Sequence, residues 1–117
     1  MSVRTFYDPK TRALLAELSG DIDHCTAAGL REPVDKEIMQ RLPQKLILDL
    51  SGVSFMDSSG IGLIIGRYKL MTDLGGSIVL TDPRPEISKL LTLAGIGRLC
   101  RVVDTHKSGS FTGGVKI

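Results

Sequence analysis

Aromatic residues and a dominant sign of charge are both scarce in this chain. Tryptophan is absent from the 117 residues, and aromatic residues make up only 4% of them. A surface that stacks nucleic-acid bases needs exposed aromatic rings. Fifteen Lys and Arg residues stand against 13 Asp and Glu residues, which gives a formal net charge of +2. Such a weak field does not hold a phosphate backbone, so the composition argues against direct binding of nucleic acid.

Cysteine and long hydrophobic segments are also rare. Cys25 and Cys100 are the only cysteines, and they lie far apart with no CxxC pair. This usage favours a reduced intracellular protein over one held by disulfides. The N-terminal residues lack the apolar core of a signal peptide, and no apolar run approaches the roughly 20 residues of a membrane span. We therefore expect a cytoplasmic protein with no membrane partner.

The residues that are abundant predict a single α/β domain. Hydrophobic residues make up 42% of the chain and charged residues 24%, as in ordinary globular domains. Alternating or continuous apolar segments predict strands, and repeats of three and four residues predict helices. Strands are expected at 3–7, 13–19, 45–50, 77–81 and 99–103, and two of the helices from 58 to about 74 and from 85 to 94.

One further helix is expected between the second and third strands. Leu30, Val34 and Ile38 repeat every four residues, but Pro33 interrupts the pattern. Either the helix is kinked at Pro33, or residues 26–30 form a separate turn and Pro33 lies in the first turn of the main helix. The second arrangement is favoured because proline is well tolerated in a first turn.

The resulting order is β-β-α-β-α-β-α-β. Strands joined through helices run parallel with right-handed crossovers, whereas the first two strands form an antiparallel hairpin. This order predicts a mixed, mostly parallel sheet with helices packed against it. The segment 45–50 is nearly all apolar, which is typical of a strand covered on both faces. Residues 1–104 are expected to form the domain and residues 105–117 a Gly/Ser-rich tail.

The segment 54–62, SFMDSSGIG, carries the strongest functional signal. Asp57 or Ser58 suits the N-cap of the next helix, with Gly60 in its first turn, and this structural role alone would account for the motif. The segment also follows a central strand, where open α/β sheets place their sites. A phosphoryl group on Ser58 is expected to meet free backbone N–H groups and the positive end of the helix dipole, beside the like charge of Asp57.

Enzymatic alternatives match the sequence poorly. Gly60, Gly62 and Gly66 resemble a dinucleotide fingerprint, but one spacing is wrong and a loop over 51–57 is expected before them. A P-loop and a GxSxG motif are absent. Isolated histidines also leave Ser58 without a catalytic base. We expect no enzyme and no cofactor.

A metal site at the corner after the second predicted strand is disfavoured as well. Asp21, Asp23, His24 and Cys25 are too close together in sequence to converge readily on one ion. The alternatives are a polar corner with Asp23 capping the following helix, or carboxylates offered to an arginine of a partner.

The residues 46–62, LILDLSGVSFMDSSGIG, together with GRYK at 66–69, resemble the anti-sigma factor antagonists of the STAS family. Weaker similarity lies in LSGDIDH at 18–24 and LAGIG at 93–97, so the resemblance covers roughly residues 13–103. The likeness is greatest to antagonists of the sporulation sigma-F pathway. It implies the STAS fold, although relatives usually end in a fourth amphipathic helix where this chain is rich in glycine and serine.

The resemblance also implies a partner-switching cycle in transcription regulation. The unphosphorylated antagonist binds an ATP- or ADP-bound anti-sigma factor that is also a serine kinase, and the sigma factor is released. Phosphorylation of the serine after the motif aspartate, here Ser58, ends the binding, and a PP2C-type phosphatase reverses it. The remaining partner-binding positions implied are Asp23, Asp57, Ser59, Gly60, Ile61 and Gly62. The alternative is a STAS scaffold or an accessory subunit of a transporter or signalling complex.

Overall fold

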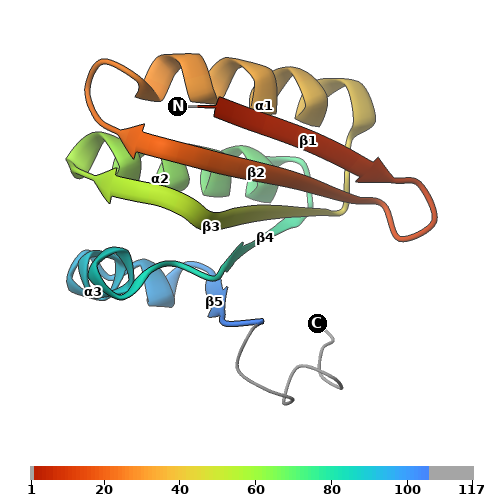
Figure 1. Ribbon diagram of the computed structural model, residues 1–117. Coiled ribbons are helices and arrows are strands. Elements are labelled where there is room, and N and C mark those ends of the chain that lie inside the picture. The colour runs from red at the N-terminus through yellow and green to blue at the C-terminus, as the bar shows by residue number, and fades with distance from the viewer. Residues whose placement is uncertain (1, 106–117) are drawn as a thin grey trace.

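The computed structural model describes residues 2–105, and the predicted order of elements is confirmed (Figure 1). The predicted tail over 105–117 lies outside the described residues except for Thr105. A short 3-10 helix, η1, precedes the last strand. The elements are β1 (Ser2–Asp8), β2 (Ala13–Ile22), α1 (Ala27–Arg41), β3 (Lys45–Met56), α2 (Ser58–Asp73), β4 (Ser77–Thr81), α3 (Pro85–Leu93), η1 (Ile96–Arg98) and β5 (Arg101–Val103).

The five strands lie in the sheet in their order along the chain, β1-β2-β3-β4-β5. The pair β1–β2 is antiparallel, and the pairs from β2 to β5 are parallel, as predicted. Each crossover steps in the same direction across the sheet. Right-handed crossovers that all step one way place their helices on one face. In Figure 1, α1 accordingly lies along β1 and β2, and α2 lies next to it behind β2 and β3.

The core lies between that face of the sheet and the helices. Alternate residues of β2 and β3 are fully or almost fully buried, among them Leu14, Leu18, Leu46 and Leu50. Ile38 of α1, Met71 of α2 and Leu91 of α3 belong to the same cluster. Burying such a side chain contributes about 1.5–3 kcal/mol before the entropy of ordering is subtracted.

The apolar run in β3 is covered on one face only, so the expectation of a strand covered on both faces is wrong for the described residues. Leu46, Leu48 and Leu50 are buried, whereas Lys45, Ile47 and Asp49 between them are partly exposed. The opposite face carries none of the described helices, because every crossover steps the same way.

β3 also continues to Met56, so the expected loop over 51–57 is wrong. The pairs Asp21–Phe55 and Ile22–Met56 extend the parallel ladder with β2 across two register shifts. Buried Val53 and Met56 stand three residues apart rather than two, which hides the strand from a search for period-two alternation. α2 therefore begins directly after this strand.

Helix α1 is continuous from Ala27 to Arg41 with Pro33 inside it, so the favoured interpretation of a separate turn at 26–30 is wrong. Proline cannot donate to the carbonyl of Gly29, one turn earlier, but Gly29 is exposed and its carbonyl can meet water. Leu30, Val34 and Ile38 are all buried against the sheet. The free energy gained by burying these three side chains exceeds the cost of a proline inside a helix, which is about 3 kcal/mol.

The two cysteines differ in their exposure to solvent. Burial raises the pKa of the Cys100 thiol, which keeps this thiol protonated and unreactive, whereas Cys25 is exposed. In the part of the chain that the structure describes, no helix has both the length and the apolarity to cross a membrane.

Candidate functional site

The sequence-predicted site residues meet at the edge where the parallel strands β2 and β3 end. The N–H of Asp57 donates to the carbonyl of Ile22 at 3.2 Å, which ties the end of β3 to the end of β2. Asp23 follows β2 directly, and Ser58 follows Asp57. In Figure 1 the tips of β2 and β3 and the starts of α1 and α2 lie together. The structure thus joins two motifs that are more than 30 residues apart in the chain.

Asp57 is the N-cap of α2. Its backbone is extended, and its Oδ1 accepts a hydrogen bond of 2.8 Å from the N–H of Ser59. Its carbonyl accepts from the N–H groups of Gly60 and Ile61 at 3.0 and 3.3 Å. The expectation of free N–H groups for a phosphate is therefore wrong at these three positions, since Asp57 already satisfies them. A phosphoryl group on Ser58 would compete with the Asp57 carboxylate.

Ser58 is exposed in the first turn of α2, whereas Ser59 is only partly so. No described core contact depends on Ser58, and the position accepts an added group without repacking. The two serines are therefore distinguished by access, which sequence spacing alone does not show.

Gly60 is buried because α2 begins directly against the end of β3. A Cβ placed on Gly60 would lie 2.2 Å from Cγ of Met56. Ile61 is partly buried against the core, while Gly62 is exposed and an added Cβ there would have nothing within 4 Å. Gly60 is thus needed for close packing, whereas Gly62 lies on the exposed side of the start of α2.

Asp23 organises the turn that leads into α1. Its Oδ1 accepts from the N–H groups of Cys25 and Thr26 at 2.9 and 3.1 Å, and its own N–H donates to Thr26 Oγ1 at 3.0 Å. The formal N-cap of α1 is Thr26, which makes no side-chain cap bond to the helix. The expected N-cap at Asp23 is therefore wrong, because Thr26 is the N-cap and the Asp23 side chain instead fixes the turn before α1.

Substitution of Asp23 separates its structural role from any role of its charge. Asp23→Asn keeps an oxygen acceptor for Cys25 and Thr26 and should leave the free energy of unfolding nearly unchanged. Asp23→Ala removes the acceptor and should cost about 1 kcal/mol. Chemical unfolding of both variants measures this difference. Equal stability of Asp23→Ala and the unsubstituted chain would contradict a structural role of Asp23 in this turn.

A buried ion pair behind the site was not anticipated from the sequence. Arg67, in α2, is only 8% exposed, and its Nε lies 2.9 Å from Oδ1 of Asp35, in α1. Burial lowers the pKa of Arg67, Asp35 opposes this effect, and the nearby charge of Arg31 adds to it. In the sequence, Arg67 is notable only as part of GRYK at 66–69. No sequence pattern pairs it with Asp35, which is 32 positions away.

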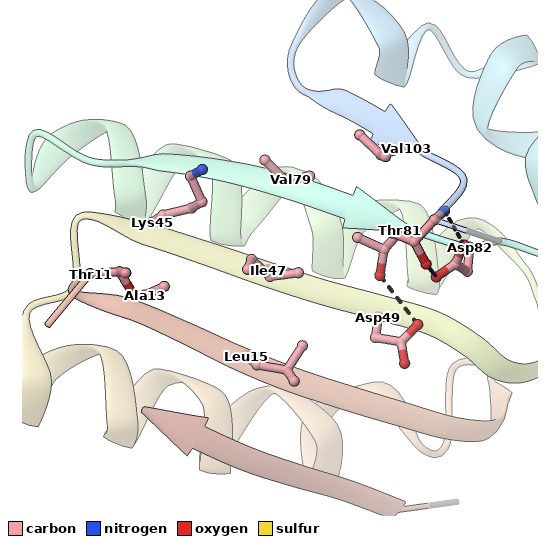
Figure 2. A pocket seen from close by; sticks show the side chains of 11 residues that line it. Thr11, Ala13, Leu15, Lys45, Ile47, Asp49, Val79, Thr81, Asp82 and Val103 are labelled. Atoms are coloured by element: carbon pink, nitrogen blue, oxygen red, sulfur yellow. Dashed lines mark hydrogen bonds between the residues drawn. The ribbon is translucent and has the colours of Figure 1, made fainter. Parts of the chain in front are cut away.

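The open face of the sheet forms a shallow pocket of about 500 Å³ (Figure 2). Its floor is aliphatic, with Leu15, Ile47 and Val79 projecting from three adjacent strands. At one end, Asp49 accepts from Thr81 and Asp82 accepts from Thr105. These hydrogen bonds hold the ends of the strands together.

The glycines of α2 do not make a dinucleotide site. A loop between the strand and these glycines was one argument against such a site. That argument was wrong, because α2 begins directly after β3. The wrong spacing remains, and Asp82, which stands about where a ribose-binding carboxylate is expected, is bonded to Thr105. Within residues 2–105, no three His, Cys, Asp or Glu side chains gather as metal ligands.

Comparison with known proteins places this geometry in a family. The STAS domain model matches residues 8–109. The chain belongs to the STAS domain family. An anti-sigma F factor antagonist from Paenibacillus polymyxa is 37% identical over 93 residues, which are 80% of each chain. The STAS fold inferred from the sequence is thereby confirmed.

Two solved structures extend the similarity to the fold of anti-sigma factor antagonists. SpoIIAA in its unphosphorylated form shares 26% identity and a TM-score of 0.75, over 88% of this chain and 87% of that one. The Bacillus cell fate determinant SpoIIAA in its phosphorylated form has the same identity and a TM-score of 0.68, over 88% and 90%. The Paenibacillus relative and SpoIIAA are both named as anti-sigma factor antagonists, and SpoIIAA has been solved in unphosphorylated and phosphorylated forms.

Proposed function

We propose that this STAS protein is an anti-sigma factor antagonist whose partner binding is switched off by phosphorylation of Ser58. Its unphosphorylated form binds a nucleotide-bound anti-sigma factor with serine kinase activity and so releases the sigma factor. A PP2C-type phosphatase restores it. The protein itself acts as a binding module and not as an enzyme.

The observation that carries the proposal is the position of Ser58. Its hydroxyl is exposed at the edge where the ends of β2 and β3 meet, beside the partner-binding positions implied at 57, 59 and 60–62. Asp23 lies on the same edge, and the hydrogen bonds that its carboxylate accepts from described residues use Oδ1, which leaves Oδ2 to accept from an arginine of the partner. The similarity to SpoIIAA, which is solved with and without phosphate, supports the same interpretation.

The switch follows from charge and not from refolding. A phosphoryl group adds about 1.5–2 negative charges next to Asp57, whose carboxylate already occupies the N–H of Ser59. The phosphate therefore cannot take that hydrogen bond without displacing Asp57. Uncompensated charge in the centre of an interface costs several kcal/mol, enough to abolish binding.

Mass spectrometry tests the modification directly. The chain is incubated with ATP and the purified anti-sigma kinase of the same organism, and peptides are mapped. We expect one phosphate, on Ser58, and none on Ser58→Ala. Ser59→Ala is the matched control and should still be modified. No phosphate from a kinase that is active on another substrate would contradict the proposal and favour a STAS scaffold.

A further inference from the structure

A groove of about 340 Å³ runs between α1 and α2 and opens beside the candidate site. Arg31 and Ala27 of α1 line one wall, and Ser59, Gly66 and Arg67 of α2 line the other. The groove exists because its walls are built from small residues. Gly66 has nothing within 4 Å of an added Cβ, so side chains leave this space open.

The positive charge in the groove exceeds the negative charge. Arg31 and Arg67 both line it, and Arg31 is close enough for its charge to lower the pKa of Arg67. Among residues 2–105, Asp35 is the one acidic residue that forms an ion pair with Arg67. Two guanidinium groups and one carboxylate leave one net positive charge, with exposed His24 at the rim.

The Arg67 guanidinium also has N–H groups without a hydrogen-bond partner among the described residues. Its side chain is 10% exposed, yet the buried Nη1 has no hydrogen-bond partner among the described residues. Nε lies 2.9 Å from Oδ1 of Asp35, but these two atoms do not have the geometry of a hydrogen bond. A buried guanidinium with unmet donors is costly, and a second acceptor would reduce that cost.

The dipoles of the two helices favour the same kind of ligand. α1 and α2 follow parallel strands, so both begin at the edge where β2 and β3 end (Figure 1). Each helix start carries a partial positive charge. Anionic groups are therefore attracted into the groove from the side on which Ser58 lies.

We infer that the α1–α2 groove is a second contact region for the anti-sigma partner and receives one of its acidic side chains between Arg31 and Arg67. This inference rests on the proposed function and extends it away from Ser58. A single carboxylate matches the one net positive charge, and it leaves the Asp35–Arg67 pair in place. The small wall residues give such a side chain room to enter.

Binding of the purified anti-sigma factor, loaded with ADP, tests this contact. Arg31→Gln removes an exposed charge from the groove and should weaken binding about tenfold, with a smaller dependence on salt. Lys36→Gln is the matched control, because it removes the same charge from an exposed position of α1 outside the groove. Gly66→Leu fills the groove and should weaken binding at least as much, and thermal unfolding verifies that both variants fold.

A charge exchange identifies the side chain of the partner. Arg31→Glu should bind more weakly than Arg31→Gln, and replacing one acidic residue of the partner by lysine should restore its affinity. Unchanged affinity in folded Arg31→Gln and Gly66→Leu would overturn the groove contact while the Ser58 switch stands. Failure of the unsubstituted chain to bind would overturn both.

Discussion

Ser58→Asp should abolish tight binding to the anti-sigma factor without unfolding the protein. The substitution places a carboxylate at an exposed position in the first turn of α2, next to Asp57. The affinity should fall about 100-fold or more, because an unpaired charge enters the centre of the interface. The dipole of α2 favours the new charge and Asp57 opposes it. The free energy of unfolding should therefore change by less than about 0.5 kcal/mol.

Titration calorimetry and thermal unfolding of the same samples test this separation of binding from stability. Ser58→Ala is the control and should bind like the unsubstituted chain, since it removes only an exposed hydroxyl. Undiminished binding by Ser58→Asp would exclude charge at this position as the switch. A large loss of stability would mean that Ser58 has a structural role, which its exposure does not indicate.

Gly60→Val should cause the second large effect, a loss of stability. The added Cβ would lie 2.2 Å from Cγ of buried Met56, so either α2 or Met56 has to move. Overpacking of this kind costs about 1–3 kcal/mol, and we expect a value near 3 kcal/mol. The unfolding temperature should fall by about 10 °C. The same movement displaces Asp57 and Ser58, so partner binding should weaken as well.

A glycine on the same helix supplies the control for Gly60. Gly66→Val introduces the same side chain where nothing lies within 4 Å of the added Cβ, and stability should change by less than about 0.5 kcal/mol. In a double-mutant cycle, Met56→Ala should recover part of the cost of Gly60→Val, with a coupling of at least about 1 kcal/mol. Additive effects would show that Met56 is not the obstacle.

The sequence predicted most of the elements because their periods are strong. Alternation over 13–19 and the apolar segments at 45–50 and 77–81 identified three of the five strands. The order of strands and helices then left a mostly parallel sheet as the natural topology. Local chemistry left Asp57 and Ser58 as candidates for the N-cap of α2, and the structure assigns this role to Asp57.

The wrong predictions share a cause, which is that local signals compete with packing. Pro33 predicts a helix boundary, but three buried aliphatic residues on one face keep α1 continuous. A loop was expected over 51–57, but pairing with β2 keeps residues 52–56 in β3. The apolar run at 45–50 suggests two covered faces, whereas sequential right-handed crossovers cover only one.

By itself, the amino-acid sequence predicted the order of the elements through its periods, and its resemblance to the STAS family implied Ser58 as the serine of the proposed switch. Tertiary structure decided which distant residues meet. Asp57 bonds to Ile22, the neighbour of Asp23, because β2 and β3 are adjacent parallel strands that end at one edge. Arg67 meets Asp35 because α1 and α2 pack side by side on one face. Contacts of this kind depend on crossover direction and packing across the sheet, which no local pattern encodes.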